Sequence, residues 1–203
     1  MIILKNPNAS LQNYTHNKNL AGRVLQRKLF KRTGVRQGVN SIDKFKNTNG
    51  EIDVNGVKQI IPYEEPFLFI DRVLKIDKKS IVAIREVKAE ESYLKGHFRG
   101  FPIMPGALIV EGLGQAATML VRYNIPNHEE KDILAYKIRG AKFFRPTFPG
   151  QTLRFEAKLL FMFKKIAFVN GNVFRKDKLV SKVKMVLAIV DKKWFREKYT
   201  KKI

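Results

Sequence analysis

The sequence predicts an α+β domain in which antiparallel strands wrap one long, buried helix. Residues 106–123 are apolar on nearly every face of a helix, with glycines and alanines that let other backbone approach closely. Further along, apolar side chains occupy every second position, as in a strand with one buried face: Leu153, Phe155, Ala157, Leu159 and Phe161. A helix with so narrow a polar face has to be covered by a sheet, so both observations favour the same architecture.

The other elements follow from apolar runs and turn residues. Apolar segments at 60–62 and 67–73 precede a strand near 81–87, and a polar loop from Asn124 to Asp132 follows the helix. Four strands are predicted downstream: Ile133–Ile138, Leu153–Phe161, Ile166–Phe174 and Leu179–Val190. The turn signals that separate them are Pro149-Gly150, Asn170-Gly171 and Lys176-Asp177-Lys178.

The chain is long enough for one domain and an extension, and its charge is strongly positive. We expect a basic N-terminal extension over residues 1–50 and a folded domain over residues 51–203. The net charge is +22; residues 1–50 hold ten basic residues and one acid, Asp43, which leaves +13 for the rest. Charge of this size favours nucleic acid, an anionic membrane or an acidic protein as partner.

The extension is predicted to contain a short basic amphipathic helix. Its apolar residues recur at helical spacing between arginines and lysines: Leu20, Ala21, Val24, Leu25 and Leu29. Three interpretations stay open: a loosely docked arm, an arm that threads into RNA, and a presequence for targeting to a mitochondrion or plastid. A bacterial-type cytoplasm is the alternative location.

Composition excludes several kinds of chemistry. The chain has no cysteine, which rules out disulfides, thiolate catalysis and cysteine metal sites. Its three histidines are too scattered for a metal site, so neither a metal nor another cofactor is predicted. The best candidate for a membrane span, residues 107–121, is interrupted by Glu111 and Gln115 and is shorter than the roughly 18 residues a span requires.

The most informative stretch is residues 96–106, GHFRGFPIMPG, with Glu111 shortly after it. His97 and Glu111 are set in a segment otherwise poor in polar groups, and the glycines and prolines between them predict a tight loop before the helix. A histidine and a carboxylate in a dry pocket form an acid–base pair. The other two histidines, His16 and His128, stand in polar surroundings and are predicted to be surface residues.

The polar residues of the helix form one stripe. Glu111, Gln115, Thr118 and Arg122 stand at i, i+4, i+7 and i+11. A buried carboxylate is costly unless it is partnered, so Glu111 is predicted to serve a function. Gln115 either supports Glu111 or lies at an interface, and the sequence leaves both open.

Several motifs follow one another in a recognisable order: Pro66–Arg72, Gly96–Phe98, Ile103–Gly106, Ile109–Glu111, Gln115–Ala117, Phe144–Pro146 and Pro149-Gly150. Together they resemble the FabZ type of (3R)-hydroxyacyl-acyl carrier protein dehydratase, over about residues 57–190. The resemblance implies a hotdog fold, with a sheet wrapped round one central helix, and no cofactor. It also implies a homodimer, with a trimer of dimers left open.

The resemblance assigns roles in the removal of water from a hydroxyacyl thioester during fatty acid biosynthesis. His97 of one subunit removes a proton from C2, and Glu111 of the other subunit protonates the departing C3 hydroxyl. The Gly106 N–H, at the start of the helix, stabilises the thioester oxygen. Phe98 and Phe101 are expected to line a tunnel for the acyl chain, and Gln115 is grouped with these substrate-binding residues.

The positive charge fits an acidic acyl carrier protein, and Arg99, Lys142 and Arg145 are the predicted docking residues. Two alternatives remain. A hotdog thioesterase shares the fold and the interfacial site but usually lacks this series of motifs. A dehydratase-like subunit of a large ribonucleoprotein, such as an organellar ribosome, would explain the basic extension and the charge.

Three departures from the family pattern stand out. Tyr63-Glu64-Glu65 replaces the usual His-Arg-Tyr, with an expected effect on gating or partner contacts of this segment. Arg99 replaces a proline, with an expected effect on the entrance of the tunnel. Gly112 and Gly114 stand where larger residues are usual, which predicts looser packing of the helix.

Overall fold

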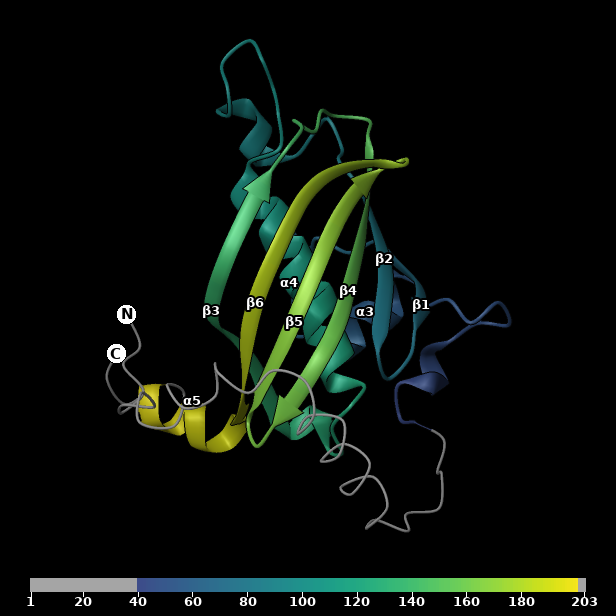
Figure 1. Cartoon of the computed structure of the whole chain (residues 1–203), viewed down its shortest axis with the longest axis vertical. Helices are drawn as coiled ribbons and strands as arrows, with labels where there is room; N and C mark the ends of the chain where they lie inside the picture. The colour runs from purple at the N-terminus through teal and green to yellow at the C-terminus, as the bar shows by residue number, and fades with distance from the viewer. Residues whose placement is uncertain (1–39, 201–203) are drawn as a thin grey trace, which may run out of the picture. The chain divides into compact units, whose positions relative to one another are not determined.

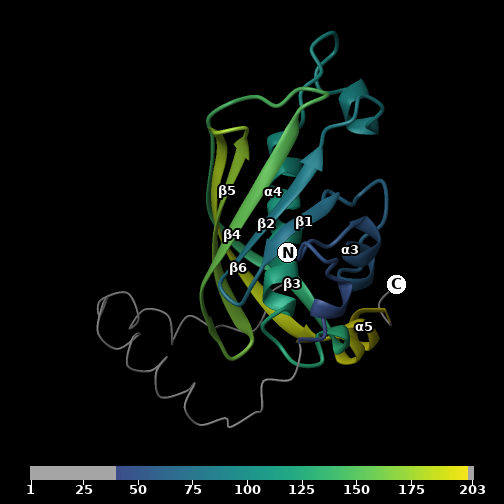
Figure 2. The ribbon, with the colours of Figure 1, turned by 90° about the vertical axis from the view of Figure 1, so that its right-hand side faces the viewer.

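The computed structural model describes residues 40–200, and it confirms the predicted α+β hotdog arrangement. A six-stranded antiparallel sheet curves round the helix α4 (Gly106–Arg122), as Figures 1 and 2 show from two directions. The amphipathic helix expected near Leu20–Leu29 and the surface position expected for His16 lie outside the described residues.

The sheet has the order β1-β2-β4-β5-β6-β3. Its strands are β1 (Arg72–Ile76), β2 (Ser80–Glu86), β3 (Lys131–Phe143), β4 (Thr152–Phe163), β5 (Ile166–Arg175) and β6 (Lys178–Asp191). The other helices are α3 (Val54–Ile60) and α5 (Lys192–Thr200), with short 3-10 turns η2 (Asp43–Phe45), η3 (Ser92–Lys95) and η4 (His128–Glu130). None of the helices within residues 40–200 is long and apolar enough to cross a membrane.

Glycines let α4 and the sheet approach each other closely. A Cβ atom on Gly112 would lie 2.6 Å from the Phe155 ring, and one on Gly171 would lie 2.6 Å from Cδ2 of Leu113. Gly112 therefore tightens the packing that it was predicted to loosen, while the space beside Gly114 is open. The pair Asn170-Gly171, predicted as a turn, lies within β5 because its glycine makes room for Leu113.

Strand β3 is longer than predicted and forms an open edge of the sheet. Its residues from Ala135 to Phe143 are all exposed, including Ile138 at 52 % and Phe143 at 52 %. The opposite edge strand, β1, is partly covered, because Ile52 pairs with Val73 in a β-bridge. An edge with exposed apolar side chains is a surface on which another chain can pack.

Residues 40–50, which the sequence analysis placed in the extension, pack against the domain. Ile42 is fully buried in the core, and Asn40 Nδ2 donates a hydrogen bond to the Tyr123 carbonyl over 2.8 Å. The Tyr123 hydroxyl donates to Asp43 over 2.9 Å, and Lys46 pairs with the same carboxylate over 2.6 Å. This segment therefore anchors the C-terminal end of α4.

The expectation of a surface position for His128 is wrong. The side chain is buried, and neither ring nitrogen has a hydrogen-bond partner within residues 40–200. Glu129 Oε1 lies 3.3 Å from Nε2, but without hydrogen-bond geometry. Burial lowers the pKa of His128, and the positive charges of Arg122 and Lys44 act in the same direction against the charge of Glu129.

His128 makes the stability of the domain pH-dependent. Because the folded pKa lies below the unfolded value, the unfolded chain takes up a proton first as the pH falls through about 6.5. The free energy of unfolding should therefore fall, by at most about 1.4 kcal/mol per pH unit from this group. Urea denaturation between about pH 8 and pH 5 measures the slope.

The control is His128→Phe, a buried ring without a titratable group. Its free energy of unfolding should depend less steeply on pH than that of the wild type over the same range. Equal slopes for the two proteins would show that the pKa of His128 is the same in the folded and the unfolded chain.

Candidate active site

The loop that carries His97 is closed by paired backbone hydrogen bonds. Phe98 N–H donates to the Phe101 carbonyl over 3.0 Å, and Phe101 N–H donates back to the Phe98 carbonyl over 2.9 Å. Between them Gly100 has a φ of +73°, which glycine adopts without strain. Arg99 takes the preceding turn position with an exposed side chain. The turn thus forms without the proline usual in the family.

Ile103 fixes the His97 ring. The Ile103 N–H donates to the His97 carbonyl over 2.9 Å, and the Ile103 carbonyl oxygen lies 3.0 Å from Nδ1. A carbonyl oxygen only accepts, so Nδ1 carries the proton and the neutral ring keeps a lone pair on Nε2. The half-buried ring also stacks on Phe98, with centroids 4.2 Å apart. This contact therefore leaves Nε2 as the ring nitrogen with a lone pair.

Gln115, one helical turn beyond Glu111, orients the carboxylate. Its Nε2 donates to Glu111 Oε1 over 3.0 Å and to the Phe67 carbonyl over 2.8 Å. Its Oε1 accepts from Phe69 N–H over 2.8 Å. Gln115 is fully buried, and both of its donor hydrogens are used in these contacts, one of them on Glu111.

Glu111 itself is half-buried, and its second oxygen has no hydrogen-bond partner within residues 40–200. The nearby Tyr63 is half-buried; burial raises its pKa, and the negative charge of Glu111 raises it further. Tyr63 belongs to the segment that departs from the family pattern, and it replaces the expected histidine with a neutral phenol beside the carboxylate. The second oxygen of Glu111 is therefore left without a partner in the part of the chain that the structure describes.

Gly106 begins α4 and offers a free backbone N–H. The first turn of a helix has no internal partners for its N–H groups, and the partial positive charge of the helix gathers there. Within the described residues, hydrogen bonds of this turn start at Leu108, whose N–H donates to Pro105. A Cβ on residue 106 would lie 2.9 Å from the Phe143 ring, so glycine lets this ring pack closely against the start of the helix.

The expected carrier-docking residues lie round the His97 loop. The Met104 N–H donates to the Thr147 carbonyl over 2.8 Å, and the Phe101 ring meets Phe148 edge-on at 5.4 Å. The loop therefore packs against the segment after β3, which carries Arg145. Lys142 stands at the end of β3, and it is exposed, as are Arg99 and Arg145.

A buried arginine, which sequence reasoning missed, joins two segments that lie beside the site. Arg85 on β2 is 2 % exposed; its Nη1 lies 2.7 Å from Asp71 Oδ1 and 3.8 Å from Glu65, and its Nη2 pairs with Glu91. The segment with Asp71 also carries Phe67 and Phe69, and the one with Glu91 leads into η3 and His97. The only signal in the sequence was the position of this arginine: buried and less buried side chains alternate along β2, and Arg85 stands where a buried one is expected.

His97 and Glu111 do not contact each other within the described part of one chain. No hydrogen bond or ion pair joins His97 to Glu111 within residues 40–200. Within the same range no three histidine, aspartate or glutamate side chains converge to hold a metal ion. One chain thus offers two half-sites, the loop with His97 and the helix face with Glu111.

Comparison with known proteins agrees with this arrangement. The FabA-like domain family matches residues 61–184. The 3-hydroxyacyl-[acyl-carrier-protein] dehydratase FabZ of Solibacter usitatus is 35% identical over 141 residues, covering 70% of this chain and 87% of that protein. FabZ of Koribacter versatilis is 37% identical over 140 residues, with 68% and 90% covered. A chain of the dehydratase heterocomplex ApeI:P of Xenorhabdus doucetiae has the same fold, with a TM-score of 0.59 at 15% identity over 70% of this chain and 95% of that one.

The fold and the two half-sites define a hotdog protein of the dehydratase class. By sequence, this chain belongs to the FabA-like family and groups there with the FabZ dehydratases.

Arg85 should be indispensable for stability. The change Arg85→Met leaves the buried carboxylate of Glu91 without its partner, so the free energy of unfolding should fall by about 3–5 kcal/mol. Arg154→Met is the matched control, because Arg154 pairs with Glu156 in a more exposed position and should lose less than about 1 kcal/mol. Urea denaturation of both variants decides; equal losses would show that the Arg85 cluster contributes no more than a surface pair.

Proposed function

We propose that this protein removes water from a (3R)-3-hydroxyacyl group carried on acyl carrier protein and forms the trans-2-enoyl product. The observation that carries the proposal is the His97 ring, held by Ile103 with Nε2 free, on a chain that also orients Glu111. The substrate is the one named for the FabZ relatives.

The reaction is an elimination in which both residues transfer protons. His97 Nε2 takes a proton from C2, the C2–C3 double bond forms, and the C3–O bond breaks as Glu111 protonates the leaving hydroxyl to give water. The Gly106 N–H donates to the thioester oxygen, where negative charge develops. General acid–base catalysis is typically worth about 10²–10⁴ in rate, and one oxyanion donor about 10²–10³. Protons return through solvent from His97 to Glu111.

The active site is completed by two subunits in this proposal. The open edge of β3 exposes Tyr136, Ile138 and Phe143, which a second copy would cover. The two half-sites of a single chain are not joined, so His97 of one subunit would face Glu111 of the other. The exposed rings of Phe98 and Phe101 would then line the acyl tunnel between the subunits.

Loss of either residue should abolish turnover. His97→Ala and Glu111→Gln should each lower kcat by at least about 10²-fold in an assay of water loss from carrier-bound substrate. Both variants should stay folded, because the amide oxygen that Glu111→Gln introduces can still accept from Gln115, and His97 lies on a surface loop.

Mixing the two inactive variants tests the shared site. Random exchange of subunits should restore about a quarter of the wild-type sites, because each mixed dimer has one site with both residues intact. Mixed dimers that remain inactive after proven exchange would refute the cross-subunit assignment.

We propose further that the positive residues round the His97 loop receive the acidic carrier. Changing Arg99, Lys142 or Arg145 to Glu should raise KM for the carrier-bound substrate, and the effect should shrink at high salt. Rates on a short, uncharged thioester should stay unchanged, since these side chains do not reach the reacting atoms. Unchanged KM with the carrier in all three variants would exclude this docking face.

A structural role in a ribonucleoprotein is the second candidate, favoured by the net charge of +22. The oriented His97 and Glu111 argue against it, because a structural subunit does not need them. Targeting to a mitochondrion or plastid by the basic residues before Asp43 also stays a proposal, and microscopy of a fusion of residues 1–50 to a fluorescent protein tests it.

A further inference from the structure

The end of the sheet remote from the His97 loop carries an exposed patch of apolar and basic side chains. Figures 1 and 2 both place the β4–β5 hairpin and α5 at one end of the sheet, and η3 with the loop after it at the other. The patch, called the distal patch here, consists of Leu160, Phe161, Phe163, Lys164, Lys165, Lys193, Trp194 and Lys198. Its apolar members are exposed by 41 % to 51 %.

The hairpin and α5 adjoin through the end of β6. The Lys165 carbonyl accepts from Ile189 N–H over 2.8 Å, and two residues later Asp191 accepts from Trp194 N–H over 3.0 Å. The hydrogen bond from Trp194 N–H and the pairing with Lys131 lower the pKa of Asp191, and the positive charge of Lys165 adds to this effect. The two parts of the patch therefore belong to one surface.

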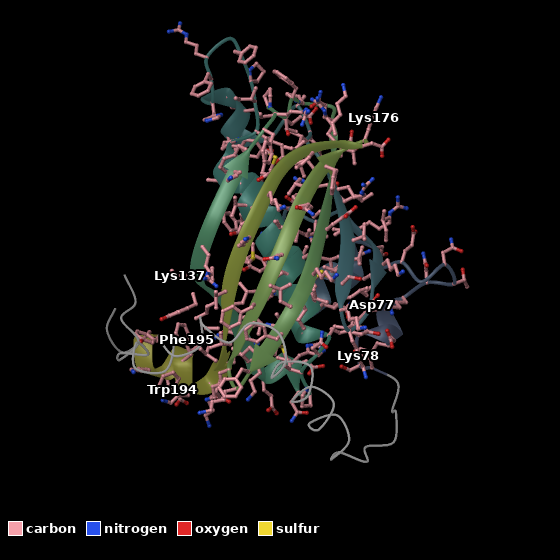
Figure 3. The ribbon with its side chains drawn as sticks, viewed as in Figure 1. Asp77, Lys78, Lys137, Lys176, Trp194 and Phe195 are labelled. Atoms are coloured by element: carbon pink, nitrogen blue, oxygen red, sulfur yellow. The ribbon has the colours of Figure 1, made fainter. Side chains whose placement is uncertain are left out.

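Helix α5 is fixed with its aromatic and basic outer face toward solvent. Phe195 and Tyr199 are half-buried and pack together at 4.8 Å, and Arg196 pairs with Asp132 over 3.0 Å. The opposite face exposes Lys193, Trp194 and Lys198; Figure 3 labels Trp194 and Phe195 at this end. Trp194 thus stays 50 % exposed although the helix is held on the domain.

The surroundings of the patch are strongly positive. Residues 157–169 contain three basic residues and no acid, and α5 has four basic residues against Glu197 alone. Exposed apolar side chains set among lysines match the boundary of an anionic bilayer, where rings enter the headgroup layer and lysines meet phosphates. We infer that the distal patch docks the protein on an anionic lipid surface.

The aromatic rings of the distal patch each have one face covered, which favours lipid rather than nucleic acid as the partner of the patch. Lys198 Nζ lies 4.7 Å above the Trp194 ring, and Lys164 Nζ lies 5.4 Å above the Phe163 ring. Phe161 is stacked on Phe168 at 4.3 Å. Stacking on bases uses free ring faces, and each of these rings already has one face covered. Insertion into headgroups needs only exposed apolar surface, which Leu160 also supplies.

Docking at this end leaves the catalytic loop free. The His97 loop and the carrier-docking residues lie at the opposite end of the sheet, so they would point into solvent. The inference does not depend on the proposed dehydratase function.

Trp194 is the only tryptophan of the chain, so its fluorescence reports on the patch alone. The full-length protein is titrated with vesicles of phosphatidylglycerol and phosphatidylcholine, and separately with pure phosphatidylcholine. Anionic vesicles should shift the emission to shorter wavelength, and brominated lipid should quench it; salt should weaken both effects. Zwitterionic vesicles should have little effect.

A matched pair of variants locates the site. Lys164→Glu with Lys193→Glu should lower the partition coefficient at least about 10-fold, since each basic residue near the surface is worth about 1 kcal/mol. Lys176→Glu with Lys178→Glu, at the other end of the sheet, should bind as the wild type does; Lys176 and Lys164 share nearly the same backbone φ, 52° and 53°.

Three results would overturn the inference. They are an unshifted Trp194 spectrum with anionic vesicles, equal loss of binding in both pairs of variants, and RNA binding that the Lys164/Lys193 variant loses while vesicles leave Trp194 unaffected. The last result would assign the patch to nucleic acid.

Discussion

The side-chain amide of Gln115 is the interaction on which the rest of the site depends. From the buried face of α4 it binds the carboxylate of Glu111 and both sides of the segment at Phe67 and Phe69. Loss of this amide would leave a buried donor and acceptor unpaired, at a cost of about 1–3 kcal/mol for each group. The same three hydrogen bonds therefore hold α4 to the segment at residues 67–69 and fix the carboxylate of Glu111, the proposed acid.

The fold holds His97 and Glu111 in fixed orientations, each in its own half-site, and the two side chains do not contact each other within the described part of the chain. The Ile103 carbonyl binds Nδ1 of the His97 ring. Arg85 joins the segment with Asp71 to the segment with Glu91, which leads into the His97 loop. Because groups held before the reaction need no reorganisation during it, such positioning lowers the barrier directly. In the proposed dimer, contact through β3 then has only to bring the His97 loop of one subunit beside Glu111 of the other.

Sequence reasoning reached the parts of the site that local patterns specify. His97, Gly106 and Glu111 stand in short motifs, and the long central helix α4 followed from its composition. His128 and Arg85 were not predicted as buried groups, because the burial of His128 depends on the packing of η4 and that of Arg85 on ion pairs with Asp71 and Glu91, which the local pattern does not show. Asn170-Gly171 was mistaken for a turn, since only the packed Leu113 side chain shows why a strand needs glycine there.

The central claim is that Gln115 holds Glu111 by binding residues 67–69, and amide hydrogen exchange at Phe69 tests it most directly. In the wild type the Phe69 N–H should exchange as slowly as the amides of β5, because its hydrogen bond to Gln115 is buried. In Gln115→Leu it should exchange much faster while β5 stays protected. A Phe69 amide that remains equally protected in the variant would contradict the account.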